Sequence, residues 1–276
     1  MGSTFPFRLG LALADKGPLC VGIDPSKELL DAWGLDDEAE GVERLARTAI
    51  EAVAGVAGVV KVQVAFFERH GAAGYIALER VLGEAFEAGL VVIGDAKRGD
   101  IPTTNLGYAD AWLRDDSPLC VDALTVSCYL GVQAMSGLFE LAHRTGRGVF
   151  AVAASSNNEG RVVQTARLAD GRTVESGLLD DLREANKALD AGGEPVHCIG
   201  AVVGAQRRPE GLEVFEGPVL VPGIGAQGAG TDDVKSLLAI VPHDLVTVTV
   251  SRGILAAGPS LLALRSAASS YASDLQ

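Results

Sequence analysis

The chain has 276 residues, a formal net charge of −13 and a sequence pI of about 4.7. This acidic balance argues against a nucleic-acid-binding face and against adhesion to anionic membranes, so Lys and Arg side chains must hold any anionic ligand locally. No apolar run reaches the roughly 18 residues of a membrane span, and the N-terminus lacks a basic segment leading into an apolar signal core, so we expect a cytoplasmic protein.

Short apolar runs rich in β-branched residues recur along the chain and predict eight strands. They cover residues 19–24, 59–67, 90–95, 123–128, 148–155, 197–204, 218–222 and 245–250. Helix-like stretches with one apolar stripe lie between them, among others at 74–88, 132–144, 176–189, 232–241 and 260–272. The strands are apolar on both faces, which is typical of a parallel sheet.

The alternation of these elements predicts the fold. The β and α units follow one another without a Pro-rich or Ser-rich linker, and we expect one domain over residues 1–276. The pattern favours an α/β fold of the (β/α)₈ barrel type, and an open doubly wound sheet is the second interpretation. Charged residues gather where the predicted strands end, which is where barrel enzymes place their sites.

The first two strands each contribute one ionisable candidate. Asp24 lies at the tip of the first strand and precedes Pro25, where its carboxylate can accept hydrogen bonds from sugar hydroxyls. An Asp before Pro is also a common turn former, so a structural role stays open. Lys61 lies inside the apolar second strand, where an unpaired charge is costly, and its natural partner is Asp95.

The third strand leads into a dense run of charges, because residues 95–101 read Asp-Ala-Lys-Arg-Gly-Asp-Ile. Side chains alternate along a strand, so Asp95 and Lys97 project to the same side, and Asp100 lies just past the strand on a loop. A structural ion-pair network is the plainer interpretation, but the combination with Lys61 favours a functional site. Thr104, before the next helix, can be a binding residue or only a helix cap.

The fifth strand is followed by the main irregular stretch of the chain, residues 157–172. This stretch is polar, and its position after a strand predicts a lid or an active-site loop. Ser156 directly precedes it, and the same ambiguity between ligand contact and local capping applies to this residue.

A glycine-rich loop begins at Pro222 after the seventh strand. Its glycines let backbone N–H groups approach an anion near a helix N-terminus. Gly223, Gly225 and Gly228 also fit the dinucleotide fingerprint G-x-G-x-x-G. That fingerprint normally wants an acidic residue at the end of the next strand, where this chain has Arg252. We therefore expect Gln227, Arg252 and backbone amides to hold a phosphomonoester.

These motifs together resemble the orotidine 5′-phosphate decarboxylase family over nearly the whole chain. They are Val21-Gly22-Ile23-Asp24-Pro25, Lys61 with Ala65-Phe66-Phe67-Glu68, the run from Asp95 to Ile101, Pro222-Gly223-Ile224-Gly225-Ala226-Gln227, and Ser251-Arg252-Gly253. The chain length and the Ala-Phe-Phe-Glu segment are similar to the long bacterial branch. Two segments depart from it: residues 155–158 read Ser-Ser-Asn-Asn where Thr-Ser-Asn-Pro is common, and Gly-Ala-Gly follows Gln227 in place of Gly-Gly.

The resemblance implies an activity and the residues that carry it. The family decarboxylates orotidine 5′-phosphate to UMP and CO₂, the last step of de novo UMP synthesis, without a metal or cofactor. The implied catalytic residues are Lys61, Asp95, Lys97 and Asp100; Lys97 stabilises a carbanion at C6 and delivers a proton to it. The implied substrate contacts are Asp24, Ile101, Thr104, Ser156, Pro222, Gly225, Gln227, Arg252 and Gly253.

The resemblance also implies a homodimer, in which Asp100, Ile101 and Thr104 of one protomer complete the site of the other. Three other functions stay open. One is a Mg²⁺-dependent sugar-phosphate lyase of the same superfamily, although those enzymes typically place a metal-binding carboxylate where this chain has Lys61. The others are a nicotinamide-dependent oxidoreductase and a non-catalytic phosphate-binding barrel.

Overall fold

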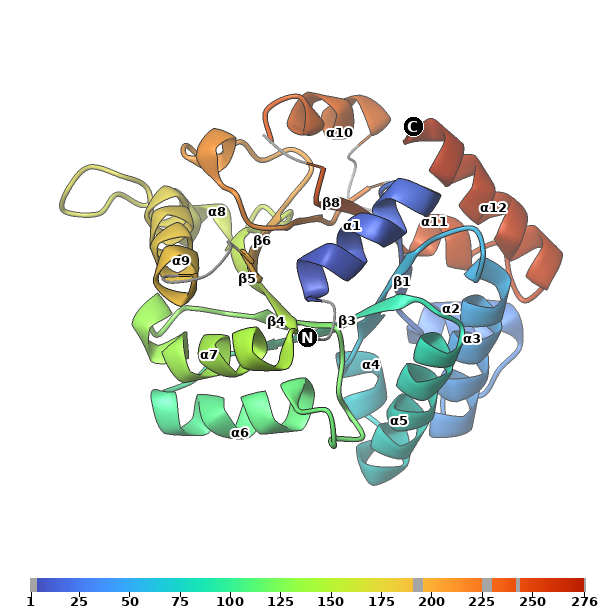
Figure 1. Cartoon of the computed structure of the whole chain (residues 1–276). Coiled ribbons are helices and arrows are strands. Elements are labelled where there is room, and N and C mark those ends of the chain that lie inside the picture. Colours follow the sequence, from blue (N-terminus) through green and yellow to red (C-terminus); the bar gives the residue numbers. More distant parts are fainter. Residues whose placement is uncertain (1–3, 191–195, 225–229, 242–243, 276) are drawn as a thin grey trace.

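The strands of the chain close into a barrel in sequence order (Figure 1). The computed structural model describes residues 4–190, 196–224, 230–241 and 244–275. The strands are β1 (Leu19–Ile23), β2 (Val59–Gln63), β3 (Val91–Arg98), β4 (Ala123–Val126), β5 (Gly148–Ala154), β6 (Ile199–Val203), β7 (Val219–Val221) and β8 (Val246–Val250). All neighbours pair in parallel, and β8 pairs with β1. The predicted (β/α)₈ barrel is confirmed, and the open sheet is wrong.

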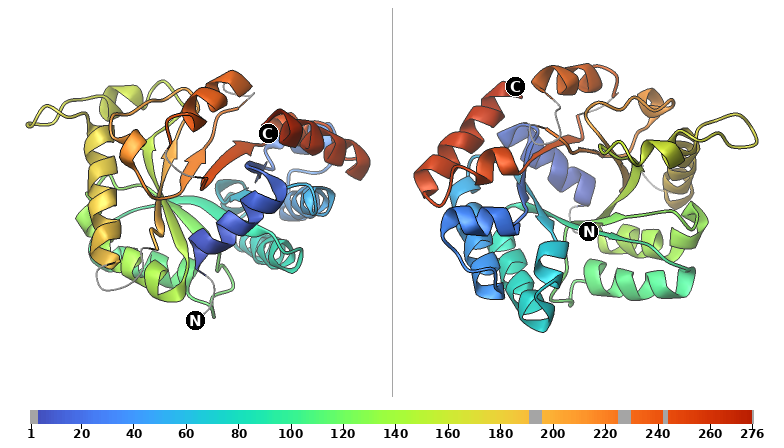
Figure 2. Two further views of the ribbon diagram at one scale, coloured as in Figure 1. Left: turned by 45° about the horizontal axis from the view of Figure 1, so that its top comes forward. Right: turned by 180° about the vertical axis from the view of Figure 1, so that it is seen from behind.

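Helices surround the barrel on all sides (Figure 2). They are α1 (Phe5–Lys16), α2 (Lys27–Trp33), α3 (Ala39–Val53), α4 (Ala65–Glu68), α5 (Gly71–Glu87), α6 (Pro102–Leu113), η1 (Val132–Met135), α7 (Ser136–Thr145), α8 (Arg161–Gln164), α9 (Val174–Leu189), η2 (Leu212–Val214), α10 (Thr231–Leu238), α11 (Arg252–Leu255) and α12 (Leu261–Asp274). Local sequence explains several of their ends. Ser26, Thr173 and Ser260 accept a backbone N–H at the starts of α2, α9 and α12, and Gly146 ends α7 in a left-handed conformation. No helix in the described ranges is long and apolar enough to cross a membrane.

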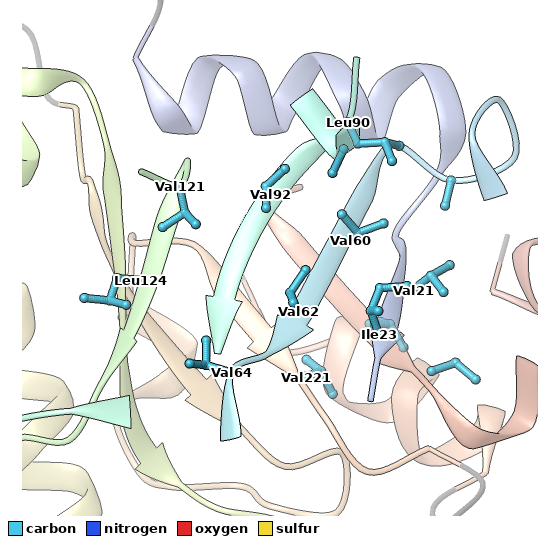
Figure 3. Packing of buried hydrophobic residues seen from close by; sticks show 14 of the residues in the cluster. Val21, Ile23, Val60, Val62, Val64, Leu90, Val92, Val121, Leu124 and Val221 are labelled. Carbon is cyan, nitrogen blue, oxygen red and sulfur yellow. The ribbon is translucent and has the colours of Figure 1, made fainter. Parts of the chain in front are cut away.

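Alternating side chains of the strands supply two apolar cores. Val60 and Val62 face outward and belong to the larger core, which lies between the strands and the ring of helices (Figure 3). Val59, Val91 and Ile93 face the barrel interior and belong to a second, smaller core. The strands are therefore apolar on both faces near their N-terminal ends, as the sequence predicts.

Helix α1 closes the N-terminal end of the barrel, where it lies across the opening (Figure 1). Phe5, Leu9 and Leu13 recur every four residues, so they share one face of the helix, and they pack into the interior core. The ring of Phe5 meets that of Phe150 on β5 edge-on, with 5.7 Å between centroids. The closed end leaves the C-terminal end as the opening toward solvent.

The predicted boundaries of two strands need correction. The second strand ends at Gln63, and Phe67, predicted within it, lies in α4 and is fully buried in the outer core. A short apolar run can be a buried strand or a buried helix, and the pattern alone does not distinguish the two. Strand β3 continues past Asp95 to Arg98, with a register shift against β4.

Candidate active site

Two neighbouring strands bring charges into the barrel interior. Lys61 follows Val59 by two residues on β2, and Asp95 follows Ile93 by two residues on β3, so both continue the inward-facing rows of the interior core. Both side chains are buried, and the predicted Lys61–Asp95 pair is present with 2.7 Å between Nζ and Oδ2. Alternation along parallel strands therefore places an ion pair directly above an apolar layer.

Asp95 is the centre of this cluster. Its Oδ2 accepts hydrogen bonds from Lys61 Nζ and from Gln63 Nε2 at 3.0 Å. Its Oδ1 accepts from Lys97 Nζ at 2.5 Å and from Thr125 Oγ1 at 2.8 Å. With two partners on each oxygen, the carboxylate is fixed in orientation and holds one ammonium group at each oxygen.

Lys97 reaches this position through an unusual backbone. Its φ is +46°, a region that L-residues with side chains rarely adopt, and the backbone N–H donates to Thr125 Oγ1 at 3.0 Å. The same hydroxyl donates to Asp95, so Thr125 connects the backbone of Lys97 to the carboxylate that holds its ammonium group. The Lys97 side chain is half exposed, with Nζ both anchored and accessible to a ligand.

The electrostatics of the buried pair are strongly coupled. Burial alone would raise the pKa of Asp95, but the ammonium groups of Lys61 and Lys97 outweigh burial and hold that pKa well below its ordinary value. Burial would likewise lower the pKa of Lys61, but the carboxylates of Asp24 and Asp95 hold it above its ordinary value. Asp24 Oδ1 lies 3.6 Å from Lys61 Nζ. Both members of the pair are charged at neutral pH.

A cavity of about 360 Å³ opens above the cluster at the C-terminal ends of the strands. Of the predicted site residues, it is lined by Asp24, Lys61, Asp95, Lys97, Ser156, Pro222 and Arg252. These residues come from the ends of β1, β2, β3, β5, β7 and β8, so the barrel assembles them from segments far apart in the chain. Asp24 Oδ1 and Ser251 Oγ are buried without a hydrogen-bond partner among the described residues, which suits a polar ligand.

The remaining predicted residues lie elsewhere. Asp100 lies just before α6, where its carboxylate accepts the N–H of Ile101 at 2.7 Å, and it does not line the cavity. Ile101 and Thr104 are exposed on the same segment. A Cβ on Gly253 would collide with the Tyr271 hydroxyl, so that side of Gly253 faces α12 rather than the cavity. Gly225 and Gln227 lie outside the described residues.

Among the unpredicted residues that line the cavity, three are polar residues of the strands: Gln63, Thr125 and Thr249. Each is a polar residue inside an apolar strand, and Gln63 follows Lys61 by two residues, so strict use of the two-residue period would have found it. Arg207 and Glu175 form a buried ion pair beside the cavity, which the strand pattern could not predict because the two residues lie 32 positions apart in the chain.

The predicted lid at residues 157–172 divides into two parts. Residues 157–164 remain near the cavity, and Asn157 lines it. Residues 165–172 extend away from the barrel (Figure 1) and turn back at an antiparallel bridge between Arg167 and Thr173. Arg172 then pairs with Asp180 on α9 at 2.7 Å. The second part is thus held on the outside of the barrel, and the lid interpretation is restricted to the first.

Comparisons with known proteins cover nearly the whole chain. The profile described as "Orotidine 5′-phosphate decarboxylase / HUMPS family" matches residues 17–267. The orotidine 5′-phosphate decarboxylase of Salinispora tropica is 47% identical over 98% of this chain and 96% of its own length. The enzyme of the same name from Streptomyces coelicolor is 45% identical over 99% of this chain and 97% of its own length.

Solved structures have the same architecture. A protein from Streptomyces avermitilis, assigned as an orotidine 5′-phosphate decarboxylase, is 46% identical with a TM-score of 0.90, over 99% of this chain and 95% of that one. The OMP decarboxylase of Leishmania donovani is 26% identical with a TM-score of 0.76, over 99% of this chain and 97% of that one. The similarity therefore extends over the whole barrel.

Proposed function

The chain belongs to the orotidine 5′-phosphate decarboxylase family, and we propose that the cluster of Lys61, Asp95 and Lys97 is its catalytic centre. The chain is a carboxy-lyase of pyrimidine biosynthesis that converts orotidine 5′-phosphate (OMP) to UMP and CO₂. The observation that carries the proposal is the buried Asp95 carboxylate, which holds two ammonium groups at the floor of one cavity.

Lys97 is the proposed proton donor. Decarboxylation breaks the bond between C6 of the pyrimidine and the carboxylate carbon, and the electron pair stays on C6 in the ring plane. No neighbouring carbonyl delocalises this pair directly, so fixed charges must stabilise it. The Lys97 ammonium is held by Asp95 and accessible from the cavity, which suits this task. Nζ then donates a proton to C6, and the resulting amine regains a proton from solvent.

Lys61 and Asp24 are proposed to act on the ribose. Lys61 holds Asp95 in place, and its ammonium group lies between the two carboxylates of Asp24 and Asp95. Asp24 Oδ1 has no hydrogen-bond partner among the described residues and can accept a hydrogen bond from a ribose hydroxyl. This arrangement would fix the sugar and thereby place C6 beside Lys97.

The proposed phosphate grip must contribute to the rate, because one lysine is not enough. A charge pair at about 4 Å is worth roughly 4 kcal/mol at an effective dielectric near 20, whereas enzymes lower barriers by about 8 to 23 kcal/mol. We propose that Arg252 and Gln227, with Pro222 and the amides of Gly225 and Gly253, hold the phosphate and so keep the pyrimidine aligned. Arg252 lines the cavity at the start of α11.

We propose that the working form is a homodimer, with Asp100, Ile101 and Thr104 of one protomer reaching the site of the other. No hydrogen bond or ion pair joins Asp100 to Lys97 within the described part of one chain, and Asp100 bonds instead to the N–H of Ile101. Apolar side chains are exposed beside it in the chain and after the next strand: Ile101 is 54% exposed and Tyr129, after β4, is 84% exposed. Such residues suit burial in an interface.

The activity is tested by following the loss of OMP absorbance with purified protein in excess EDTA and without nicotinamide. Conversion to UMP is the expected result. Absence of turnover from folded protein, with turnover of a sugar phosphate on adding Mg²⁺, would move the assignment to the Mg²⁺-dependent lyases. NAD(P)H oxidation would indicate the oxidoreductase instead.

The shared site is tested by mixing two inactive variants, Lys97→Ala and Asp100→Asn. If Asp100 acts across the interface, each hybrid dimer contains one site with both wild-type residues. An equal mixture should then regain about a quarter of wild-type activity after subunit exchange. If Asp100 acts within its own chain, the mixture stays inactive.

Two further predictions stay proposals. We propose one domain over residues 1–276, which the pairing of β8 with β1 supports because it joins the two ends of the described barrel. A cytoplasmic location also remains a prediction. Fractionation of cells that express the protein would test it.

A further inference from the structure

A buried guanidinium behind the cavity connects three segments that the proposed mechanism does not use. Arg207 lies in the turn after β6 and is 5% exposed. Its Nη1 donates to the carbonyl oxygen of Ser155 and to Gln164 Oε1, both at 3.0 Å. Its Nη2 donates to the carboxylate of Glu175. These partners belong to the segment after β5, to α8 and to the first turn of α9.

Every polar group of Ser155 is engaged in this network. Its N–H donates to Gln164 Oε1 at 3.1 Å, and its Oγ accepts from Gln164 Nε2 at 2.8 Å, while its carbonyl accepts from Arg207. The next residue differs, because the Ser156 hydroxyl has no hydrogen-bond partner among the described residues and lines the cavity. The network thus restrains one serine and leaves the following one available to a ligand.

The turn that carries Arg207 lies directly against this segment. Gly204, at the end of β6, donates its N–H to the Ala154 carbonyl at 2.7 Å. A Cβ on Gly204 would lie 2.8 Å from Ser156 Cα, so only glycine permits this approach. The turn that carries Arg207 is therefore packed tightly against Ser155 and Ser156.

We propose that Arg207 is a positioning residue, which restrains Ser155 with the help of Gln164 and thereby presents Ser156 to the pyrimidine ring. The inference rests on the proposed function, because it takes the base to lie at the Ser156 side of the cavity. The planar guanidinium serves three acceptors at once, which the single ammonium of a lysine does not do with the same geometry. Displacement of a substrate contact by about 1 Å can cost on the order of a hundredfold in rate.

The test compares Arg207→Lys and Gln164→Met with the control Arg172→Met. Gln164→Met removes the bonds to Ser155 but leaves Arg207 paired with Glu175, so it avoids a buried unpaired charge. Arg172 also links the segment after β5 to α9, but its side chain is 41% exposed and away from the cavity. The readouts are kcat/KM for OMP, the melting temperature, and competitive inhibition by UMP and by ribose 5-phosphate, which lacks the base.

Both variants should lower kcat/KM and weaken UMP inhibition about ten- to a hundredfold, with ribose 5-phosphate inhibition and the control unchanged. If inhibition by UMP and inhibition by ribose 5-phosphate weaken equally, Arg207 acts at the sugar-phosphate end of the site, and the proposal is overturned. A lower melting temperature with unchanged kinetics would reduce Arg207 to a structural residue. If Arg207→Lys does not fold, Gln164→Met decides. Failure of the proposed function is distinguishable, because wild-type protein would then not turn over OMP.

Discussion

The two ends of the barrel interior are made by the same strands but depend on different forces. At the N-terminal end, Val59 and Ile93 pack beneath α1 in an apolar layer. Two residues further along the same rows, Lys61 and Asp95 form an ion pair. The change from an apolar to a charged interior therefore occurs over one two-residue step on each strand.

This difference assigns stability to one end and chemistry to the other. Burying apolar surface contributes directly to folding, so the layer under α1 stabilises the barrel roughly in proportion to the apolar area that it buries. A buried ion pair roughly breaks even, because its attraction is offset by the loss of hydration. We therefore expect substitutions at the apolar end to lower stability with little effect on turnover, and substitutions around the cavity to do the reverse.

The largest expected effect is on turnover at the charged end. Lys97→Ala removes the proposed proton donor, and kcat/KM for OMP should fall at least about a thousandfold. The side chain is half exposed and the buried Asp95 keeps Lys61 as its partner, so the free energy of unfolding should change by at most about 2 kcal/mol. Steady-state kinetics and urea unfolding measure the two quantities. Lys27, which forms an exposed pair with Asp31, is the matched control, and Lys27→Ala should change neither.

An Arg252→Ala variant, compared with a surface control, separates local phosphate binding from the long-range electrostatic effect of the protein's net charge on the substrate. Loss of a charge-assisted contact to a phosphate should lower kcat/KM about ten- to a hundredfold. Removing any positive charge from an acidic chain also weakens its attraction for an anionic substrate, so Arg114→Ala on the exposed surface is the control. Equal losses in the two variants would refute a local grip by Arg252.

At the apolar end, Leu9→Ala should do the opposite of Lys97→Ala. Leu9 is fully buried in the interior core, so its truncation should cost about 2 to 5 kcal/mol in the free energy of unfolding. Well below the melting temperature, kcat should stay within about twofold of wild type, because the charged layer is unchanged. Leu11 on the same helix is 57% exposed, and Leu11→Ala should cost less than about 0.5 kcal/mol. A large drop in kcat for folded Leu9→Ala would show that the two ends are coupled.

The charged end was the part of the site most open to prediction from sequence. The strand pattern gives the inward rows, and the spacing of Asp95 and Lys97 places both on one side of β3. Lys61 was predictable because a charge in a buried strand requires a partner. The fold followed from the same alternation, since eight apolar runs separated by helices leave few arrangements.

Tertiary packing decided what the sequence did not show. The role of α1 was not predicted, because Phe5 and Leu9 gain meaning only once the barrel opening exists. The backbone of Lys97 depends on the Thr125 hydroxyl from the next strand. Arg207 and Glu175 are ordinary surface residue types, and only the packing of the turn after β6 against α9 buries them together.

The smallest expected effect is that of pH, and its sign follows from the pair. The pKa of Asp95 is held below 3.8 because Lys61 and Lys97 outweigh burial, so its stabilising contribution is present above that value and is lost as the pH falls further. The pKa of Lys61 is held above 10.5 because Asp24 and Asp95 outweigh burial, so its contribution is present below that value and is lost as the pH rises further. Neither group changes charge between about pH 5 and 9.

The second ionisation of the substrate phosphate is centred at about pH 6. Because the Lys61–Asp95 pair does not change charge from pH 7 to 9, this pair should alter kcat/KM by less than about twofold over that range. The apolar end gives no ionisation there either, because burial raises the pKa of the interior Cys20 to about 12. The reasons are opposite. Lys61 and Asp95 stay ionised because they are paired, whereas the Cys20 thiol stays neutral because it is buried. A pH profile of Lys61→Met separates them, since loss of Lys61 should move the acid limb of stability toward higher pH and leave the apolar end unchanged. An acid limb that stays at the wild-type pH would show that Lys61 is not what keeps Asp95 ionised.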